Sequence, residues 1–126
     1  MVPTDVRYTK EHEWVRVDGP SGSMGITEFA QKELGDIVWV ELPEVGRSVR
    51  AGEVLGSIES VKAVSEIYAP VTGTVEAVNE KLKDAPDLVN KDPHGRGWIC
   101  TIRLDDPAET AGLLDAAAYE TLIGAR

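Results

Sequence analysis

The sequence ESVKAVSEIYAP, residues 59–70, places a single lysine, Lys62, among small and β-branched residues. Apolar and polar residues roughly alternate on both sides of it, which is typical of β-strands. Lys62 is therefore expected where two strands meet, at or beside an exposed hairpin tip. We take this hairpin as the element around which a mainly β, α+β fold is organised.

Similar segments flank the lysine on both sides. Residues 49–59 and 67–78 each have the composition of a short strand pair, with Gly52 and Gly73 expected at the bends. Lys62 lies midway between the two segments. This pattern predicts a quasi-twofold arrangement that presents one lysine at its apex.

The rest of the chain predicts further strands and one internal helix. Residues 14–17 alternate in polarity, and residues 37–42 form the strongest strand by β-branched and aromatic content. A helix is predicted over residues 28–34, beginning after an N-cap at Thr27 and closed by Gly35. The side chains that this helix is expected to turn towards the core are Phe29, Ala30 and Leu34.

The C-terminal segment changes to helical spacing. Asp106 has the character of an N-cap, Pro107 suits the first helical position, and Glu109 completes a capping-box pattern. Gly112 and Asp115 are expected to divide this segment into two short helices. The apolar residues that recur at helical spacing are Leu113, Leu114, Ala117, Ala118, Leu122 and Ile123.

Size and charge limit the classes of function. The 126 residues suit one domain, residues 1–126. The net charge is −9, with 22 acidic against 13 basic residues, which argues against nucleic acid and anionic membranes as partners. The same charge suits partners with basic patches.

Cysteine usage and the N-terminal residues indicate a compartment. A single cysteine, Cys100, allows no internal disulfide, which favours a reducing environment. It is expected to be a small buried residue in a strand. The first residues have neither the apolar core of a signal peptide nor the character of a transit peptide, so a cytoplasmic protein is predicted.

Motifs for catalysis or metal binding do not stand out. The two histidines, His12 and His94, lie far apart, and no Cys/His cluster has metal-ligand spacing. No phosphate-binding glycine motif or nucleophile elbow is present. We therefore predict a non-enzyme with no catalytic residue and no metal.

Lys62 is better suited to tethering than to proton transfer. An exposed lysine has a pKa of about 10.4, which makes it a poor base near neutral pH. Its flexible stem can be acylated at the terminal nitrogen, which lengthens the arm and removes the charge. A rigid body could then present a covalently attached cofactor to other proteins.

Eight motifs in order resemble those of one family. They are YTKEHEW (8–14), GITEFAQ (25–31), LGDIV (34–38), ELPEVG (41–46), ESVKAVS (59–65), YAP (68–70), LVNKDP (88–93) and GRGW (95–98). With them the sequence closely resembles the H proteins of the glycine cleavage system, which are lipoyl carriers. The resemblance extends over about residues 7–123.

The resemblance implies a fold, a cofactor and partners. The fold would be a barrel-sandwich hybrid of two small antiparallel sheets (about 7–104) with short flanking helices and a C-terminal helical segment (about 106–123). Lipoate would be attached covalently to Lys62. The arm would take an aminomethyl group from glycine decarboxylase (P protein) to aminomethyltransferase (T protein), and dihydrolipoyl dehydrogenase (L protein) would reoxidise it.

The resemblance also implies roles for residues near the lysine. Glu13 and Glu66 would form the cleft that receives the loaded arm, whose aminomethyl nitrogen is expected to be cationic. A lipoate ligase or lipoyl synthase system would recognise Glu59, Ser60, Val61 and Ala63. The three tryptophans are interpreted as core or groove walls: Trp14, Trp39 and Trp98.

One stretch departs from the family pattern. Residues 20–23, PSGS, stand where relatives usually alternate apolar and polar residues. Serine and glycine weaken a strand in burial and in backbone entropy. A looser or more exposed segment is therefore predicted at residues 19–23.

Other readings of the lysine stay open at this point. The chain could be a lipoyl domain, or a lipoyl-relay protein, that serves 2-oxo-acid dehydrogenase complexes. Biotin carriers usually bracket their lysine with methionines, whereas Val61 and Ala63 stand here. An interaction module, or a stand-in enzyme, in which Lys62 is never modified is a further alternative.

Overall fold

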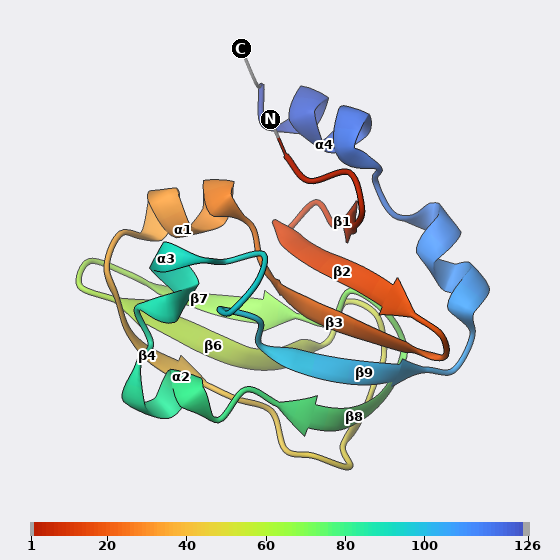
Figure 1. Ribbon diagram of the computed structural model, residues 1–126, viewed down its shortest axis with the longest axis horizontal. Coiled ribbons are helices and arrows are strands. Elements are labelled where there is room, and N and C mark those ends of the chain that lie inside the picture. The colour runs from red at the N-terminus through yellow and green to blue at the C-terminus, as the bar shows by residue number, and fades with distance from the viewer. Residues whose placement is uncertain (1, 125–126) are drawn as a thin grey trace.

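The computed structural model describes residues 2–124 as two antiparallel sheets with short helices at their margins (Figure 1). The larger sheet has the strand order β1-β2-β3-β9-β8-β5. Its strands are β1 (Arg7–Tyr8), β2 (Glu13–Asp18), β3 (Ser21–Ile26), β5 (Ser48–Val49), β8 (Gly73–Val78) and β9 (Cys100–Leu104). The smaller sheet has the order β4-β6-β7, from β4 (Ile37–Glu41), β6 (Val54–Ser60) and β7 (Val64–Tyr68). This architecture confirms the predicted mainly β fold of two antiparallel sheets.

The two strand pairs around Lys62 are nested instead of consecutive. β6 pairs with β7 in the smaller sheet, whereas β5 pairs with β8 in the larger one. Gly52 lies at a bend with a φ of 91°, as predicted. Gly73 does not: it is the first residue of β8, and a Cβ there would lie 2.0 Å from the carbonyl oxygen of Arg103. Glycine is required at this position because of close backbone approach.

Helix α1 (Glu28–Leu34) has the predicted bounds and caps. The Thr27 hydroxyl accepts from the N–H of Ala30, and the Gly35 N–H donates to the carbonyl of Gln31. The predicted inward face was only partly right. Ala30 and Leu34 pack against the core, whereas Gln31 is the buried residue of the helix and the Phe29 ring lies 4.8 Å from that of His12.

The prediction of a loose segment at residues 19–23 is wrong for most of that segment. Only Gly19 and Pro20 form an exposed turn, and β3 begins at Ser21 between β2 and β9 with partners on both sides. A Cβ on Gly22 would lie 2.8 Å from Cγ2 of Val15. The small residue therefore fits a tightly packed strand and does not loosen it.

The C-terminal segment forms the 3-10 helix η1 (Pro107–Gly112) and the helix α4 (Ala116–Leu122). Asp106 caps η1 as predicted, but no capping box forms, because Glu109 instead accepts from the N–H and the hydroxyl of Thr72. Tyr119 is the buried residue of α4, which the apolar pattern missed. Ala117, Ala118 and Leu122 are exposed.

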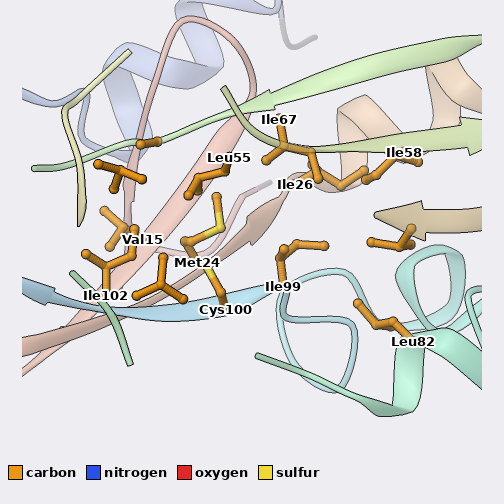
Figure 2. Packing of buried hydrophobic residues seen from close by; sticks show 14 of the residues in the cluster. Val15, Met24, Ile26, Leu55, Ile58, Ile67, Leu82, Ile99, Cys100 and Ile102 are labelled. Atoms are coloured by element: carbon orange, nitrogen blue, oxygen red, sulfur yellow. The ribbon is translucent and has the colours of Figure 1, made fainter. Parts of the chain in front are cut away.

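The larger hydrophobic cluster fills the space between the two sheets (Figure 2). Met24 and Cys100 meet there from neighbouring strands, and Leu55 and Ile67 face them from the smaller sheet. Burial raises the pKa of the Cys100 thiol to about 12, so the predicted inert buried cysteine is confirmed. Leu82 on α2 (Lys81–Asp84) and Val89 on α3 (Leu88–Lys91) close one end of this core.

A second, smaller cluster attaches the C-terminal helix to the sheet. Its buried members are Val6, Tyr8, Trp14 and Tyr119. The rings of Tyr8 and Tyr119 are stacked, with centroids 4.4 Å apart. Helix α4 therefore lies on the outside of β1 and β2, away from the main core.

Candidate functional site

Lys62 occupies a tight turn between β6 and β7, as predicted. The N–H of Ser60 donates to the carbonyl of Ala63 over 2.8 Å. The Ser60 hydroxyl accepts from the N–H groups of Lys62 and Ala63 at 3.3 and 3.0 Å. The side chain of Lys62 is exposed, while Ser60 is 5% exposed. One buried hydroxyl therefore holds the backbone from which the lysine projects.

The turn rests on the C-terminal end of α1. The N–H of Val61 donates to the carbonyl of Asp36 over 3.0 Å. Gly35 has a φ of 81°, and a Cβ built on it would lie 3.4 Å from Cε of Lys62. The lysine stem therefore passes over a residue that has no side chain.

Asn90 on α3 fixes this region and was not singled out from the sequence. Its Oδ1 accepts from the N–H of Ile37, and its Nδ2 donates to the carbonyl of Gly35 and to Oε1 of Gln31, each over 2.9 Å. One side-chain amide thus joins α1, α3 and β4. Asn90 follows the apolar Leu88 and Val89 and precedes a charged stretch. This position gave no signal in the sequence for its role.

Glu13 is a buried carboxyl group on β2. It is 2% exposed, and its Oε1 accepts from the Thr9 hydroxyl at 2.5 Å, while Oε2 accepts from the N–H of Tyr68 at 3.2 Å. Burial raises the pKa of Glu13 to about 7, against the opposing effect of the two hydrogen bonds. The pKa of Glu13 is therefore well above the ordinary value of 4.5 for a glutamate.

Glu66 is exposed on β7, two residues before Tyr68. The hydroxyl of Tyr68 reaches Oε1 of Glu66 over 3.4 Å, and the nearby Glu66 charge raises the pKa of Tyr68. Tyr68 therefore connects both carboxyl groups, one through its backbone and one through its ring. Glu13 is buried and Glu66 is exposed, and Tyr68, the last residue of β7, contacts each of them.

The residues next to the lysine differ in accessibility. Glu59, Val61 and Ala63 are exposed. Ser60 is buried and its hydroxyl is used within the turn.

The three tryptophans differ in their surroundings. Trp14 is buried and donates from Nε1 to the carbonyl of Pro93 over 2.9 Å, and Trp98 packs on the second cluster. Trp39 is 50% exposed beside a groove of about 380 Å³. Residues 2–124 contain no group of three or more His, Cys, Asp or Glu able to hold a metal ion. No helix in this range is long and apolar enough to cross a membrane.

Comparison with known proteins identifies the family. Residues 6–125 match the model of the glycine cleavage H-protein family. The glycine cleavage system H protein of Symbiobacterium thermophilum is 56% identical over 94% of this chain and 93% of its own length. A probable glycine cleavage system H protein of Haloarcula marismortui is 56% identical over 97% and 96%. The crystal structure of the H protein from Mycobacterium marinum superimposes with a TM-score of 0.90, at 38% identity, over 98% of this chain and 99% of that one.

The chain belongs to the glycine cleavage H-protein family, the lipoyl carriers of the glycine cleavage system. It is thus a component of that system and works with its other components. The match favours this assignment over the 2-oxo-acid dehydrogenase complexes that the sequence left open.

Proposed function

We propose that lipoate is attached by an amide bond to Nζ of Lys62 and that the chain itself is non-catalytic. The observation that carries this proposal is the turn at residues 60–63, which exposes one lysine on a backbone fixed by Ser60. The Lys62 stem lies against Gly35, which has no side chain to obstruct it. When bound, lipoate supplies a disulfide and dithiol pair that carries the aminomethyl group.

Glu13 and Glu66 are proposed to receive the cationic end of the loaded arm. β7 begins two residues after Lys62 and ends at Tyr68, so an arm that folds back along it would pass the exposed Glu66 and reach Tyr68, whose N–H is bonded to the buried Glu13. The approach of a cation favours the ionised form of Glu13, whose pKa of about 7 would fall. Glu13 would then release its proton and hold the cation by a charge-assisted hydrogen bond.

The proposed partners are the three enzymes of the system and a lipoylating enzyme. Glycine decarboxylase would load the arm, aminomethyltransferase would unload it, and dihydrolipoyl dehydrogenase would reoxidise it. A lipoate ligase or lipoyl synthase system would read the exposed Glu59, Val61 and Ala63 on a turn shaped by Ser60. The free, buried Cys100 fits a cytoplasmic location, which we retain as part of this proposal.

Intact mass spectrometry of the full chain from its native source tests the attachment. We expect a lipoyl-sized mass increment in the native chain and none in a Lys62→Ala variant. Lys91→Ala is a matched control, because Lys91 is also exposed, and it should keep the increment. A biotin-sized increment, or no increment where the ligase is present, would overturn the proposal.

Exchange of the glycine carboxyl carbon by glycine decarboxylase tests the carrier role separately. The lipoylated chain should support the exchange, and the Lys62→Ala variant should not. If the chain is lipoylated but supports no exchange, it is not a carrier for this enzyme.

A further inference from the structure

The turn between β1 and β2 brings a hydroxyl group against the carboxyl group of Glu13. Thr9 directly follows β1, and Glu13 is the first residue of β2. The N–H of Thr9 donates to the carbonyl of Glu13 over 2.9 Å, and the N–H of His12 donates to the carbonyl of Thr9 over 3.2 Å. These two backbone bonds close the turn and hold Thr9 beside Glu13.

The hydroxyl of Thr9 makes three hydrogen bonds, which fix the direction of its hydrogen. Its oxygen accepts from the N–H groups of Glu11 and Glu13 at 3.2 and 3.1 Å. A hydroxyl has two acceptor positions and one hydrogen. The hydrogen of Thr9 is therefore left to donate to Oε1 of Glu13, 2.5 Å away. This length is typical of a bond from a hydroxyl to an ionised carboxylate.

The carboxyl group of Glu13 is held at both of its oxygens. Thr9 donates to Oε1, and the N–H of Tyr68, on the smaller sheet, donates to Oε2 over 3.2 Å. Two donors on opposite sides fix the rotation of the carboxyl plane. An ionised carboxylate has about four acceptor positions, so these two bonds leave capacity for the donor groups of a cation.

Hydrogen bonds, and not positive charges, favour the ionised form of Glu13. The titratable groups that act on it or respond to it are Glu11 on the same turn, Tyr68 on β7 and Tyr119 on α4, and none of these three is cationic. Burial raises the pKa of Glu13, and the bond from Thr9 is the larger of the two bonds that lower it. Thr9 therefore prepares this group to meet a positive charge.

The backbone of His12, directly before Glu13, is strained. Among the residues that the structure describes, His12 is the only non-glycine residue with a positive φ, 70°. Its Nδ1 lies 2.8 Å from the hydroxyl of Tyr119, and its carbonyl accepts from the N–H of Thr27 over 3.0 Å. Strain of this kind persists only where surrounding contacts hold it, and it gathers at functional sites. The turn that aims the Thr9 hydroxyl is thus kept in one shape at a conformational cost.

We infer that Thr9 is a positioning residue for Glu13: its hydroxyl, fixed by two backbone N–H groups, donates to Oε1 and sets the direction in which the carboxylate meets the cationic end of the loaded arm. The inference rests on the proposed function, in which Glu13 binds that cation. Thr9 itself acts only through Glu13 and makes no bond to the arm.

The pKa of Glu13, measured by carbon NMR of its carboxyl group in the full lipoylated chain, tests the hydrogen bond. Thr9→Val should raise the pKa above about 7, because burial remains while the strongest opposing bond is lost. Thr9→Ser keeps the hydroxyl and should restore the native pKa. Thr121→Val is the matched control, because the Thr121 hydroxyl donates only to the Ala117 carbonyl on the exposed side of α4. If Thr9 merely holds the turn together, Thr9→Val admits water to Glu13 and its pKa falls towards 4.5 instead, which overturns the inference.

The same chains, loaded with the aminomethyl group by glycine decarboxylase and glycine, test the effect on the arm. Loading should lower the pKa of Glu13 in the native chain, because a cation favours the ionised form. Thr9→Val should hold the arm about tenfold more weakly, the scale of one hydrogen bond to a charged group. The aminomethyl group should then be lost about tenfold faster in intact mass spectrometry, and Thr9→Ser should lose it at the native rate.

The outcomes separate this inference from the proposed function. If loading leaves the pKa of Glu13 unchanged in the native chain, the proposed role of Glu13 fails, and the role of Thr9 fails with it. If the native pKa falls on loading but Thr9→Val has the native pKa and the native rate of loss, only the inference about Thr9 is overturned. Should circular dichroism show that Thr9→Val is unfolded, Thr9→Ala, which leaves space for water at the two N–H groups, is measured in the same way.

Discussion

The N–H of Tyr68 donates to Oε2 of Glu13 over 3.2 Å, and this bond joins the strand that follows the lysine to a buried acid on β2. Glu13 belongs to the larger sheet and Tyr68 to the smaller one. Burial removes this carboxyl group from water, and the two groups that donate to it, a hydroxyl and an N–H, are neutral. The pKa of Glu13 should therefore change when the two sheets fold together and again when a cation binds beside it.

Replacing Glu13 with glutamine should change the pH dependence of stability. Burial raises the pKa of Glu13 to about 7, so the folded chain binds a proton there that the unfolded chain has lost above its ordinary pKa of 4.5. The contribution of Glu13 to stability is thus fully present below about pH 4.5 and is lost as the pH rises to about 7. Over that interval the Glu13→Gln variant should gain on the order of 3 kcal/mol relative to the native chain.

Urea unfolding at pH 5 and pH 8 measures this change. Glu66→Gln, a substitution at an exposed carboxyl group, is the control and should alter stability equally at both values. If the difference between Glu13→Gln and the native chain is the same at both pH values, Glu13 is not desolvated as described.

Removing the hydroxyl of Tyr119 should loosen the C-terminal helix. This hydroxyl lies 2.7 Å from that of Thr27 and 2.8 Å from Nδ1 of His12, so Tyr119→Phe leaves two polar atoms short of a partner. We expect a loss of about 1–2 kcal/mol in the free energy of unfolding.

Tyr68→Phe is the matched control for this loss, since its hydroxyl makes a single exposed contact at 3.4 Å. A change of less than about 0.5 kcal/mol is expected there. Equal effects of the two substitutions would show that the buried network adds nothing to stability.

The hydroxyl of Ser60 should matter for both stability and modification. Ser60→Ala removes the acceptor of two N–H groups in the lysine turn, which should cost about 1 kcal/mol. We also expect slower lipoylation, because the turn no longer holds the lysine in one conformation. Rates come from mass spectrometry after exposure to a lipoate ligase, with Ser65→Ala, exposed on the same hairpin, as the control. Lipoylation of Ser60→Ala at the native rate would mean that the backbone alone maintains the turn.

Adding a methyl group at Gly22 should destabilise the sheet. The new Cβ would lie 2.8 Å from Cγ2 of Val15 and 3.3 Å from Cδ1 of Leu104, so we expect a loss of about 1–3 kcal/mol. Gly112→Ala, which meets nothing within 4 Å, should change stability by less than about 0.5 kcal/mol. Thermal unfolding compares the two, and a neutral Gly22→Ala would mean that β3 is as loose as its composition predicted.

Local signals in the sequence predicted local structure well. The helix α1 agrees at both ends because Thr27 and Gly35 each act within one turn of it. The position of Lys62 in a turn followed from alternation on its two sides. The resemblance supplied Glu13 and Glu66, and the structure joins them through Tyr68.

Features that depend on distant partners could not be predicted. Gly22 is required by Val15 on the neighbouring strand and by Leu104 far along the chain, and composition alone suggested weakness. Glu109 accepts hydrogen bonds from the N–H and the hydroxyl of Thr72 instead of forming a capping box. Asn90 and Tyr119 act through contacts to other elements, which no periodicity records.

The last strand in the sequence, β9, lies in the interior of the larger sheet between β3 and β8. The lysine hairpin can form from neighbouring residues, but the sheet that supports it stays in two parts until residues 100–104 pair on both sides. During synthesis, Lys62 therefore leaves the ribosome well before its platform exists. A modifying enzyme that recognises the assembled fold would act only on finished chains, so that translation and modification would proceed in a fixed order.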